Sequence, residues 1–205
     1  MSTATVEPPS TLTEPFVLRF APYLRLSDEA FWQLCRDNPD LFLERSADGE
    51  LIVMPPAGAD SDRRNTSATA QLWNWNRTSG LGVVFGPSAG FTLPNSAIRG
   101  PDASWISRDR WLSLSLDDRA RFSHLAPDFV TEVRSPSDSV PDLRRRMREY
   151  IDQGVRLAWL IDPINQVVEV YRPGETVEVL DRPATLSGED VLPGFVLDLK
   201  GIIDD

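Results

Sequence analysis

The sequence of 205 residues is poor in the reactive side chains that define many small sites: it has one cysteine, one histidine and one lysine. Cys35 alone cannot form a disulfide within the chain. With a single histidine, His124, the chain also lacks the Cys/His spacing of a structural zinc site. Lys200 is the only lysine, so every other fixed positive charge is an arginine.

Long apolar stretches are lacking as well, which excludes a transmembrane helix. The first residues do not combine a basic region with an apolar stretch, so we expect no secretory signal and a cytoplasmic location. Residues 1–15 are rich in Thr, Pro and Glu without periodicity, and we predict a mobile tail there. Residues 16–205 suit a single α/β or α+β domain.

Positive charge is outnumbered, with 21 Lys and Arg against 31 Asp and Glu, which leaves a formal charge of −10. This sign disfavours unspecific binding to a phosphate backbone, which depends on clustered cations. It does not exclude a site where carboxylates bind a divalent metal and a local arginine cluster holds a strand. The hydrophobic share of 41% is enough for a sizeable core.

The first half of the chain carries helix and hairpin signals. Ser27 is a typical helix N-cap, and Pro39 stops the helix that follows. Asp48-Gly49 lies between two short apolar runs, as in a β-hairpin. The predicted elements are a helix over 28–38, a hairpin of strands 41–45 and 50–54, and an amphipathic helix over 61–78 that ends at Gly80.

The second half reads mainly as short strands separated by Pro, Gly and Ser. The run 156–161 is almost wholly apolar, which is typical of a central strand. The remaining predictions are strands at 83–85, 90–93, 103–106 and 129–134, helices at 108–122 and 141–153, and an outer hairpin of 166–171 with 176–180.

Two acidic residues lie where strands should bury apolar groups. Asp102 follows Pro101 and opens one strand, and Glu132 lies inside another, on the same face as Val130 and Arg134. A carboxylate inside a sheet is costly unless it is paired or binds a cation. Two such carboxylates could bind one Mg²⁺, completed by a backbone carbonyl and waters. Alternatively, Glu132 pairs with an arginine and Asp102 caps a turn.

The predicted helix 141–153 places arginines at both borders of its buried stripe, which consists of Leu143, Met147, Tyr150 and Ile151. Arg146 falls at one border and Arg144 at the other, so either could reach the Glu132 face. Arg145 and Arg148 point away. The alternative is that all four arginines are simply solvated on the helix surface.

Three further features suggest binding but suit plain structure better. One of Trp73 and Trp75 must face the core at helical spacing, so packing is favoured over base stacking. His124 has no partner motif and is expected at the surface. Arg63-Arg64 is expected to be a solvated helix start.

A set of short motifs in a fixed order carries a family resemblance. They are Pro101-Asp102, then residues 127–135 around Glu132, Arg146 to Tyr150 with Gly154-Val155, and Trp159 to Pro163, preceded by Glu44, residues 49–56 and 90–94, and followed by Leu192 to Phe195. Over about residues 24–203 the chain resembles the Uma family of restriction endonucleases, part of the PD-(D/E)xK nuclease superfamily.

The resemblance implies a restriction-endonuclease-like fold, with a central mixed β-sheet flanked by helices and preceded by the N-terminal helix and hairpin. Asp102 and Glu132 would be catalytic acids that bind Mg²⁺ or Mn²⁺, and Glu44 would lie near the same site. The superfamily hydrolyses phosphodiester bonds with a metal that activates water and stabilises charge on the phosphate. DNA is the expected substrate, and a homodimer would supply two sites for two strands.

The chain departs from the superfamily at the catalytic lysine. Arg134 stands two residues after Glu132, where the superfamily has lysine, and the Uma lysine corresponds to Arg146 on the following helix. Arginine cannot act as a general base near neutral pH, but it can hold a phosphate with two hydrogen bonds. We therefore expect Arg146 in the catalytic site and Arg134 and Arg144 as nucleic-acid contacts.

Three functions stay open on these grounds. The first is a metal-dependent endonuclease. The second is a catalytically weakened nuclease fold that acts as a nucleic-acid-binding or regulatory module. The third is a protein–protein interaction domain that uses the outer hairpin near residues 166–180, and the charge of −10 suits this one best.

Overall fold

A computed structural model describes residues 14–20 and 23–204, so nearly all of the expected tail lies outside the described residues. The helices are α1 (Asp28–Asp37), α2 (Ala59–Ser79), α3 (Arg108–Ser113), α4 (Leu116–Arg119) and α5 (Val140–Asp152). The strands are β1 (Phe16–Leu18), β2 (Phe42–Arg45), β3 (Leu51–Met54), β4 (Gly82–Phe85), β5 (Phe91–Thr92), β6 (Ile98–Arg99), β7 (Ala103–Ser107), β8 (Phe129–Val133), β9 (Leu157–Asp162), β10 (Val167–Tyr171), β11 (Glu178–Asp181), β12 (Thr185–Ser187) and β13 (Val196–Asp198).

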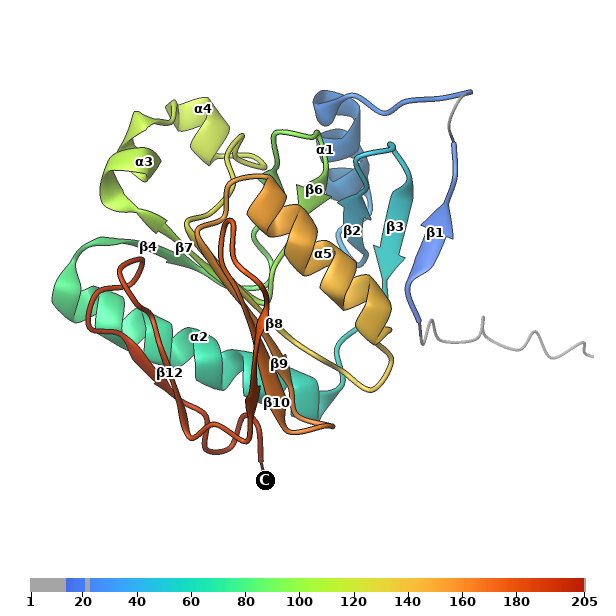
Figure 1. Cartoon of the computed structure of the whole chain (residues 1–205). Helices are drawn as coiled ribbons and strands as arrows, with labels where there is room; N and C mark the ends of the chain where they lie inside the picture. The colour runs from blue at the N-terminus through green and yellow to red at the C-terminus, as the bar shows by residue number, and fades with distance from the viewer. Residues whose placement is uncertain (1–13, 21–22, 205) are drawn as a thin grey trace, which may run out of the picture.

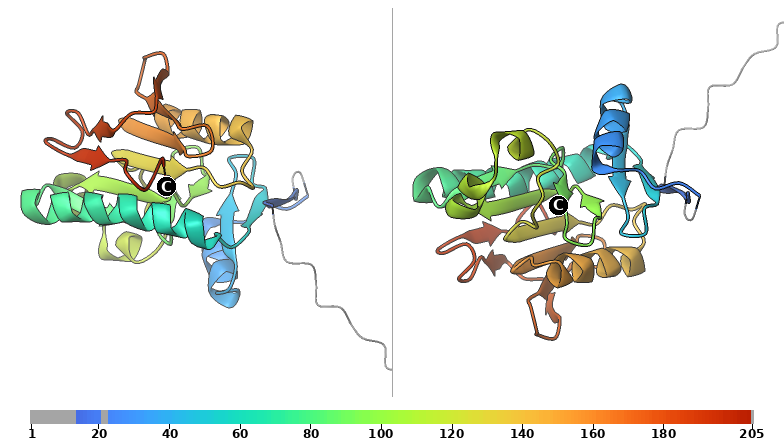
Figure 2. Two further views of the ribbon diagram at one scale, coloured as in Figure 1. Left: turned by 90° about the horizontal axis from the view of Figure 1, so that it is seen from below. Right: turned by 90° about the horizontal axis from the view of Figure 1, so that it is seen from above.

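A six-stranded mixed sheet in the order β11-β10-β9-β8-β7-β4 forms the centre of the molecule. Strands β8 and β9 are parallel, and the other neighbours are antiparallel. Helices α2 and α5 cover opposite faces of this sheet (Figures 1 and 2). The predicted central mixed sheet flanked by helices is confirmed, and the apolar run of β9 is buried throughout.

The alternation of side chains along β8 decides which face carries the acid. Phe129 and Val133 pack in the core on the α2 side, together with Ala68 and Leu72 of that helix. Val130 packs on the α5 side with Met147. Because neighbouring residues of a strand point to opposite faces, Glu132 shares the α5 face with Val130.

A second sheet, in the order β1-β3-β2-β6-β5, lies beside the central one and carries α1 (Figure 1). The predicted hairpin is confirmed as the antiparallel pair β2 and β3. The predicted N-cap is confirmed too, since Ser27 Oγ accepts a hydrogen bond from Ala30 N at 3.1 Å. Strands β1 and β6 were not predicted, because two or three residues show no periodicity.

The last strands, β12 and β13, form a hairpin that packs beside α2 on the same face of the central sheet. The backbone after this hairpin meets the start of α2, where Arg63 Nη1 donates to Gly201 O at 2.7 Å and Arg64 to Ile202 O. Arg64 is only 8% exposed. The expectation of a solvated Arg63-Arg64 pair is therefore wrong for Arg64, because the C-terminal segment covers it.

Other expectations were met with small changes. The helix expected over 108–122 is two short helices, because Ser115 caps α4 with a hydrogen bond from Asp118 N at 3.1 Å. Trp75 packs against Trp105 and Phe195, while Trp73 is exposed, so one tryptophan faces the core as predicted. No helix among the described residues combines the length and apolar character needed to cross a bilayer.

Candidate active site

Asp102 lies directly before β7, at the N-terminal end of this interior strand of the central sheet. The β7–β8 register pairs Ala103 with Thr131, and one step further along it places Asp102 opposite Glu132. Side chains in directly opposite positions of antiparallel strands lie close together on one face. Asp102 is partly exposed, and its Oδ2 accepts a hydrogen bond from Val133 N at 2.7 Å. The two predicted acids thus meet through strand pairing.

Glu132 is 5% exposed, and α5 supplies its hydrogen-bond donors. Tyr150 Oη donates to Glu132 Oε1 at 2.9 Å. Arg146 Nη1 reaches the same oxygen at 3.5 Å. Arg146 and Tyr150 lie four residues apart, which puts both on one face of the helix. The structure therefore brings Arg146 to the Glu132 face, as the helical pattern allowed.

Glu44 joins this site from β2 of the second sheet, although it is 58 residues before Asp102 in the sequence. Its Oε2 accepts from Arg146 Nη2 at 2.7 Å and from Arg99 Nη1 at 3.1 Å, and its Oε1 accepts from Gly100 N at 3.0 Å. The expectation that Glu44 lies near the acids agrees with this arrangement.

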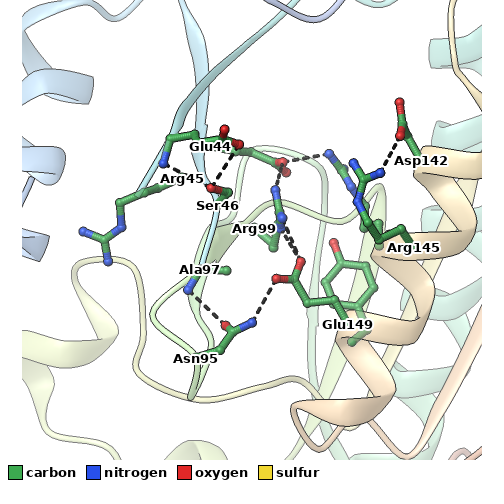
Figure 3. A network of polar contacts seen from close by, with 12 residues as sticks. Glu44, Arg45, Ser46, Asn95, Ala97, Arg99, Asp142, Arg145 and Glu149 are labelled. Carbon is green, nitrogen blue, oxygen red and sulfur yellow. Dashed lines mark hydrogen bonds and ion pairs between the residues drawn. The ribbon is translucent and has the colours of Figure 1, made fainter. Parts of the chain in front are cut away.

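Arg99 is a buried residue that the sequence analysis missed. Figure 3 shows it between Glu44 and Glu149, which come from β2 and α5. Its Nη2 lies 2.7 Å from Glu149 Oε2, and Asn95 Nδ2 donates to the other oxygen of Glu149 at 2.9 Å. The only signal was its position three residues before Asp102, because its strand of two residues is too short to show a pattern.

Two predicted nucleic-acid contacts lie away from the paired acids. Arg144 donates to Glu169 Oε1 of β10 at 2.8 Å through Nε, and 48% of its side chain is exposed. Arg134 donates to Asp162 at the end of β9, with Nη1 at 3.0 Å from Oδ2. These placements follow from the sheet order, since β8 is followed by β9 and β10 beneath α5.

The pKa values of the three acids shift in different directions, because burial raises all three and the arginines outweigh it only at Glu44. Burial raises the pKa of Glu132 to about 8, which the nearby Arg146 opposes and the charge of Asp102 reinforces. Burial also raises the pKa of Asp102 to about 6, although the hydrogen bond from the Val133 N–H acts to lower it. Burial acts in the same direction on Glu44, but Arg146 and Arg99 outweigh it and its pKa is lowered.

The site as a whole has more negative than positive groups. Its carboxylates are Asp102, Glu132, Glu44 and Glu149, together with Asp138, whose charge acts on Asp102, and its guanidinium groups are those of Arg99 and Arg146. With five acids against two arginines, the formal imbalance is three negative charges. Buried charge without a partner is costly, so the site favours either protons or a cation.

A divalent cation fits Asp102 and Glu132. Asp102 accepts two hydrogen bonds, one at each carboxylate oxygen. Glu132 also accepts two, and both go to its Oε1. Each carboxylate therefore keeps free lone pairs. Mg²⁺ commonly uses one or two protein carboxylates and retains several waters. Among residues 14–20 and 23–204, no three His, Cys, Asp or Glu side chains are grouped so as to hold a metal ion. An ion held by Asp102 and Glu132 would therefore have to take its remaining ligands from water.

The sequence of this chain matches a known protein family. The model of the Uma2 family, described as "Putative restriction endonuclease", matches residues 28–200. The chain belongs to this family. The resemblance noted in the sequence is thereby confirmed, and the match spans the N-terminal helix, the second sheet except β1, and the central sheet.

The fold of this Uma2 chain also has a solved counterpart. It is similar to the crystal structure of a "putative nuclease belonging to DUF820" from Anabaena variabilis, with a TM-score of 0.68 at 21% identity. The likeness covers 78% of this chain and 89% of the other chain. No curated protein matches the sequence. At this identity the likeness shows the fold, and family membership supports a nuclease-like function.

Proposed function

We propose that this Uma2 protein is a metal-dependent endonuclease that hydrolyses phosphodiester bonds in DNA. One observation carries the proposal: Asp102, directly before β7, lies near enough to Glu132 of β8 to raise its pKa, and Arg146 of α5 contacts the same Glu132. Residues from separate elements thus converge where strand interiors would normally be apolar. Such a cluster of buried acids with one cation is typical of a functional site.

Asp102 and Glu132 are the residues that would hold the divalent cation, Mg²⁺ or Mn²⁺. When bound, such an ion lowers the pKa of water and offsets charge that develops on the phosphate. Tyr150 fixes the Glu132 carboxylate by its hydrogen bond of 2.9 Å. The Val133 N–H holds Asp102 in the same way at 2.7 Å. Both acids are therefore oriented before any ligand arrives.

Arg146 is suited to binding the phosphate. Its Nη2 is anchored on Glu44 at 2.7 Å, whereas its Nη1 makes only a long contact of 3.5 Å with Glu132. A phosphate oxygen can take the Nη1 donor with little loss, while Glu44 keeps the guanidinium in place. Because arginine stays protonated, it cannot take a proton from water. Activation of the nucleophile must therefore come from elsewhere in the site.

The two outer arginines enter the proposal differently. Arg144 is 48% exposed and donates to Glu169 through Nε and Nη2, which leaves donor capacity for a phosphate. Its contact with DNA would be weak and dependent on salt. Arg134 is 17% exposed and paired with Asp162, so any contact of its own with DNA is secondary to that ion pair.

The test is cleavage of supercoiled plasmid DNA by the purified protein with Mg²⁺ or Mn²⁺. We expect metal-dependent nicking by the parent protein and loss of nicking in Asp102→Ala and Glu132→Ala. The matched control is Asp142→Ala, because Asp142 is exposed on α5 and pairs only with Arg145 at 2.7 Å. Cleavage that survives Asp102→Ala unchanged would refute the proposal.

The role of Arg146 has its own test. Arg146→Lys should keep or raise the cleavage rate, because lysine retains the positive charge and restores the residue type expected for the family. A large loss of rate would instead show a requirement for the two-donor geometry of the guanidinium.

A second candidate function rests on the ion pairs of Arg146. Since its guanidinium contacts both Glu44 and Glu132, it supplies part of the positive charge that the acids need. A nuclease fold in that state could bind nucleic acid without cleaving it. This candidate predicts DNA binding that weakens with salt, with no cleavage by the parent protein in either metal.

A further inference from the structure

Asn65 of α2 is a second buried neighbour of Asp102. Its side chain is covered, with the residue 8% exposed, and its Nδ2 donates to Asp102 Oδ1 at 2.7 Å. A carboxylate only accepts hydrogen bonds, so the amide must turn its nitrogen toward Asp102. This contact fixes which way the amide group faces.

The oxygen of the same amide has no partner. Asn65 Oδ1 is buried, and none of the described residues donates a hydrogen bond to it. A buried acceptor left without a donor costs about 1–3 kcal/mol, and few native groups are left in this state. Both amide atoms are bonded to one carbon, so Oδ1 lies immediately beside the Asp102 contact. The missing donor therefore belongs next to the carboxylate that would hold a cation.

We infer that Asn65 is a positioning residue of the cation site, and that its Oδ1 accepts a hydrogen bond from a water in the hydration shell of the divalent ion. The inference rests on the proposed function, because it assumes that Asp102 binds the ion. Mg²⁺ sites of this kind keep several waters, and each water is a donor. Asn65 would then hold the ligand Asp102 through Nδ2 and the hydration shell through Oδ1.

A purely structural role explains only one of the two polar atoms of the Asn65 side chain. The Nδ2 contact alone would orient Asp102, but it leaves Oδ1 buried and unbonded. On the same helix, Asn76 shows the structural alternative, because its Oδ1 accepts from Gly82 N at 3.1 Å and from Trp105 Nε1 at 2.9 Å. Asn65 differs from Asn76 in that no donor from residues 14–20 or 23–204 reaches its acceptor.

Titration of the full chain with Mn²⁺ by isothermal calorimetry tests the inference. Asn65→Leu keeps the volume of the side chain and removes both polar atoms. We expect it to weaken Mn²⁺ binding about 10-fold, since partners of metal ligands typically contribute 10–100-fold to affinity. Asn65→Asp keeps an acceptor in place of Oδ1 but loses the Nδ2 donor to Asp102, so it should bind Mn²⁺ more tightly than Asn65→Leu. Asn74→Ala, an exposed residue of α2, is the matched control and should change nothing.

Two failures are distinguishable in this experiment. If Asp102→Ala abolishes Mn²⁺ binding while Asn65→Leu binds like the parent, the inference about Asn65 is wrong and the proposed site stands. If the parent does not bind Mn²⁺, the proposed function fails and the inference fails with it. Should Asn65→Leu not fold, judged by circular dichroism, Asn65→Ala takes its place, and Mn²⁺ binding by Asn65→Ala equal to that of the parent would overturn the inference.

Discussion

Arg146 stands between two carboxylates that it contacts at different distances. Glu44 receives a hydrogen bond of 2.7 Å, and Glu132 a contact of 3.5 Å. The unequal distances agree with the pKa values, because that of Glu44 is lowered while that of Glu132 is raised to about 8. Glu44 is thus the anchor of the arginine, and Glu132 is the acid that remains short of positive charge.

This asymmetry predicts that Glu44 is important for stability. In Glu44→Gln, the partly buried Arg146 and the buried Arg99 lose the carboxylate that both contact. Removing one partner of a buried ion pair typically costs about 3–5 kcal/mol, and the cost should lie near the lower end of this range because Arg99 keeps Glu149 and Arg146 keeps Glu132. We expect a loss of this size in the free energy of unfolding, measured with urea.

The control for this prediction is Glu175→Gln. Glu175 is 60% exposed and lies 3.7 Å from Arg172, so its loss should cost about 1 kcal/mol or less. If Glu44→Gln were as mild as Glu175→Gln, Glu44 would not be the anchor of the two arginines.

Helix α5 distributes its arginines over different strands. Arg144 and Arg146 are two residues apart, which is about 200° around the helix axis. Arg144 therefore reaches β10 on one side, and Arg146 reaches β8 and β2 on the other. The helical pattern defines these two borders, but only the order of strands beneath the helix decides which arginine meets Glu132.

Helix α1 is tied to the loop after α4 through His124. The ring Nε2 lies 3.0 Å from Asp28 Oδ2 at the start of α1, and Nδ1 lies 2.6 Å from Asp118 Oδ1. The hydrogen bonds from the ring to Asp118 and Asp28 raise the pKa of His124 above its usual 6.5. The expected surface position is confirmed, since 56% of the side chain is exposed, but the ring has two acidic partners.

This link predicts a pH dependence of stability. Because the folded pKa is raised, the stabilisation is fully present below the unfolded pKa of 6.5 and is lost as pH rises through the folded value. We expect the Tm to fall over that window in the parent. His124→Gln should flatten this dependence in part, and the raised pKa values of Asp102 and Glu132 account for what remains, because deprotonation of these acids over the same range also lowers stability. If the slope of Tm against pH is unchanged in His124→Gln, the pH dependence comes from other groups.

The molecule as a whole has separate apolar cores joined by charged groups. Phe31, Leu51 and Ile98 form a core under the second sheet, and the central sheet has one core on each face. Arg99 of β6 links them, since it contacts both Glu44 of the second sheet and Glu149 of α5 (Figure 3). The site lies at this junction of the two sheets.

Arg99→Met should therefore loosen the second sheet more than the central one. We expect faster amide hydrogen exchange in β2 and β3, with little change in β8 and β9, because protection varies with local stability. Arg77→Met, an exposed residue of α2, is the control. A uniform change in all four strands would show that Arg99 contributes to global stability and does not link the two sheets.

Local signals were sufficient for much of the fold. Ser27 marks the start of α1 and Gly80, with φ of 66°, the end of α2, because caps depend on neighbouring residues only. The alternation of β8 placed Glu132 on one face and the stripe of α5 placed Arg146 at its border. These properties depend on the spacing of apolar residues along a helix or strand, and a few consecutive residues are enough to show that spacing.

Partners far apart in the sequence were decided by the tertiary structure alone. Arg99 and Asn65 stand in no motif, and they join the site because the end of β6 and the first turns of α2 lie beside the start of β7. Whether Arg144 or Arg146 meets Glu132, and whether Arg64 is solvated, depends equally on what packs against the helix. Side-chain periodicity predicts which face of an element is buried, but which partner lies opposite that face depends on how all elements pack together.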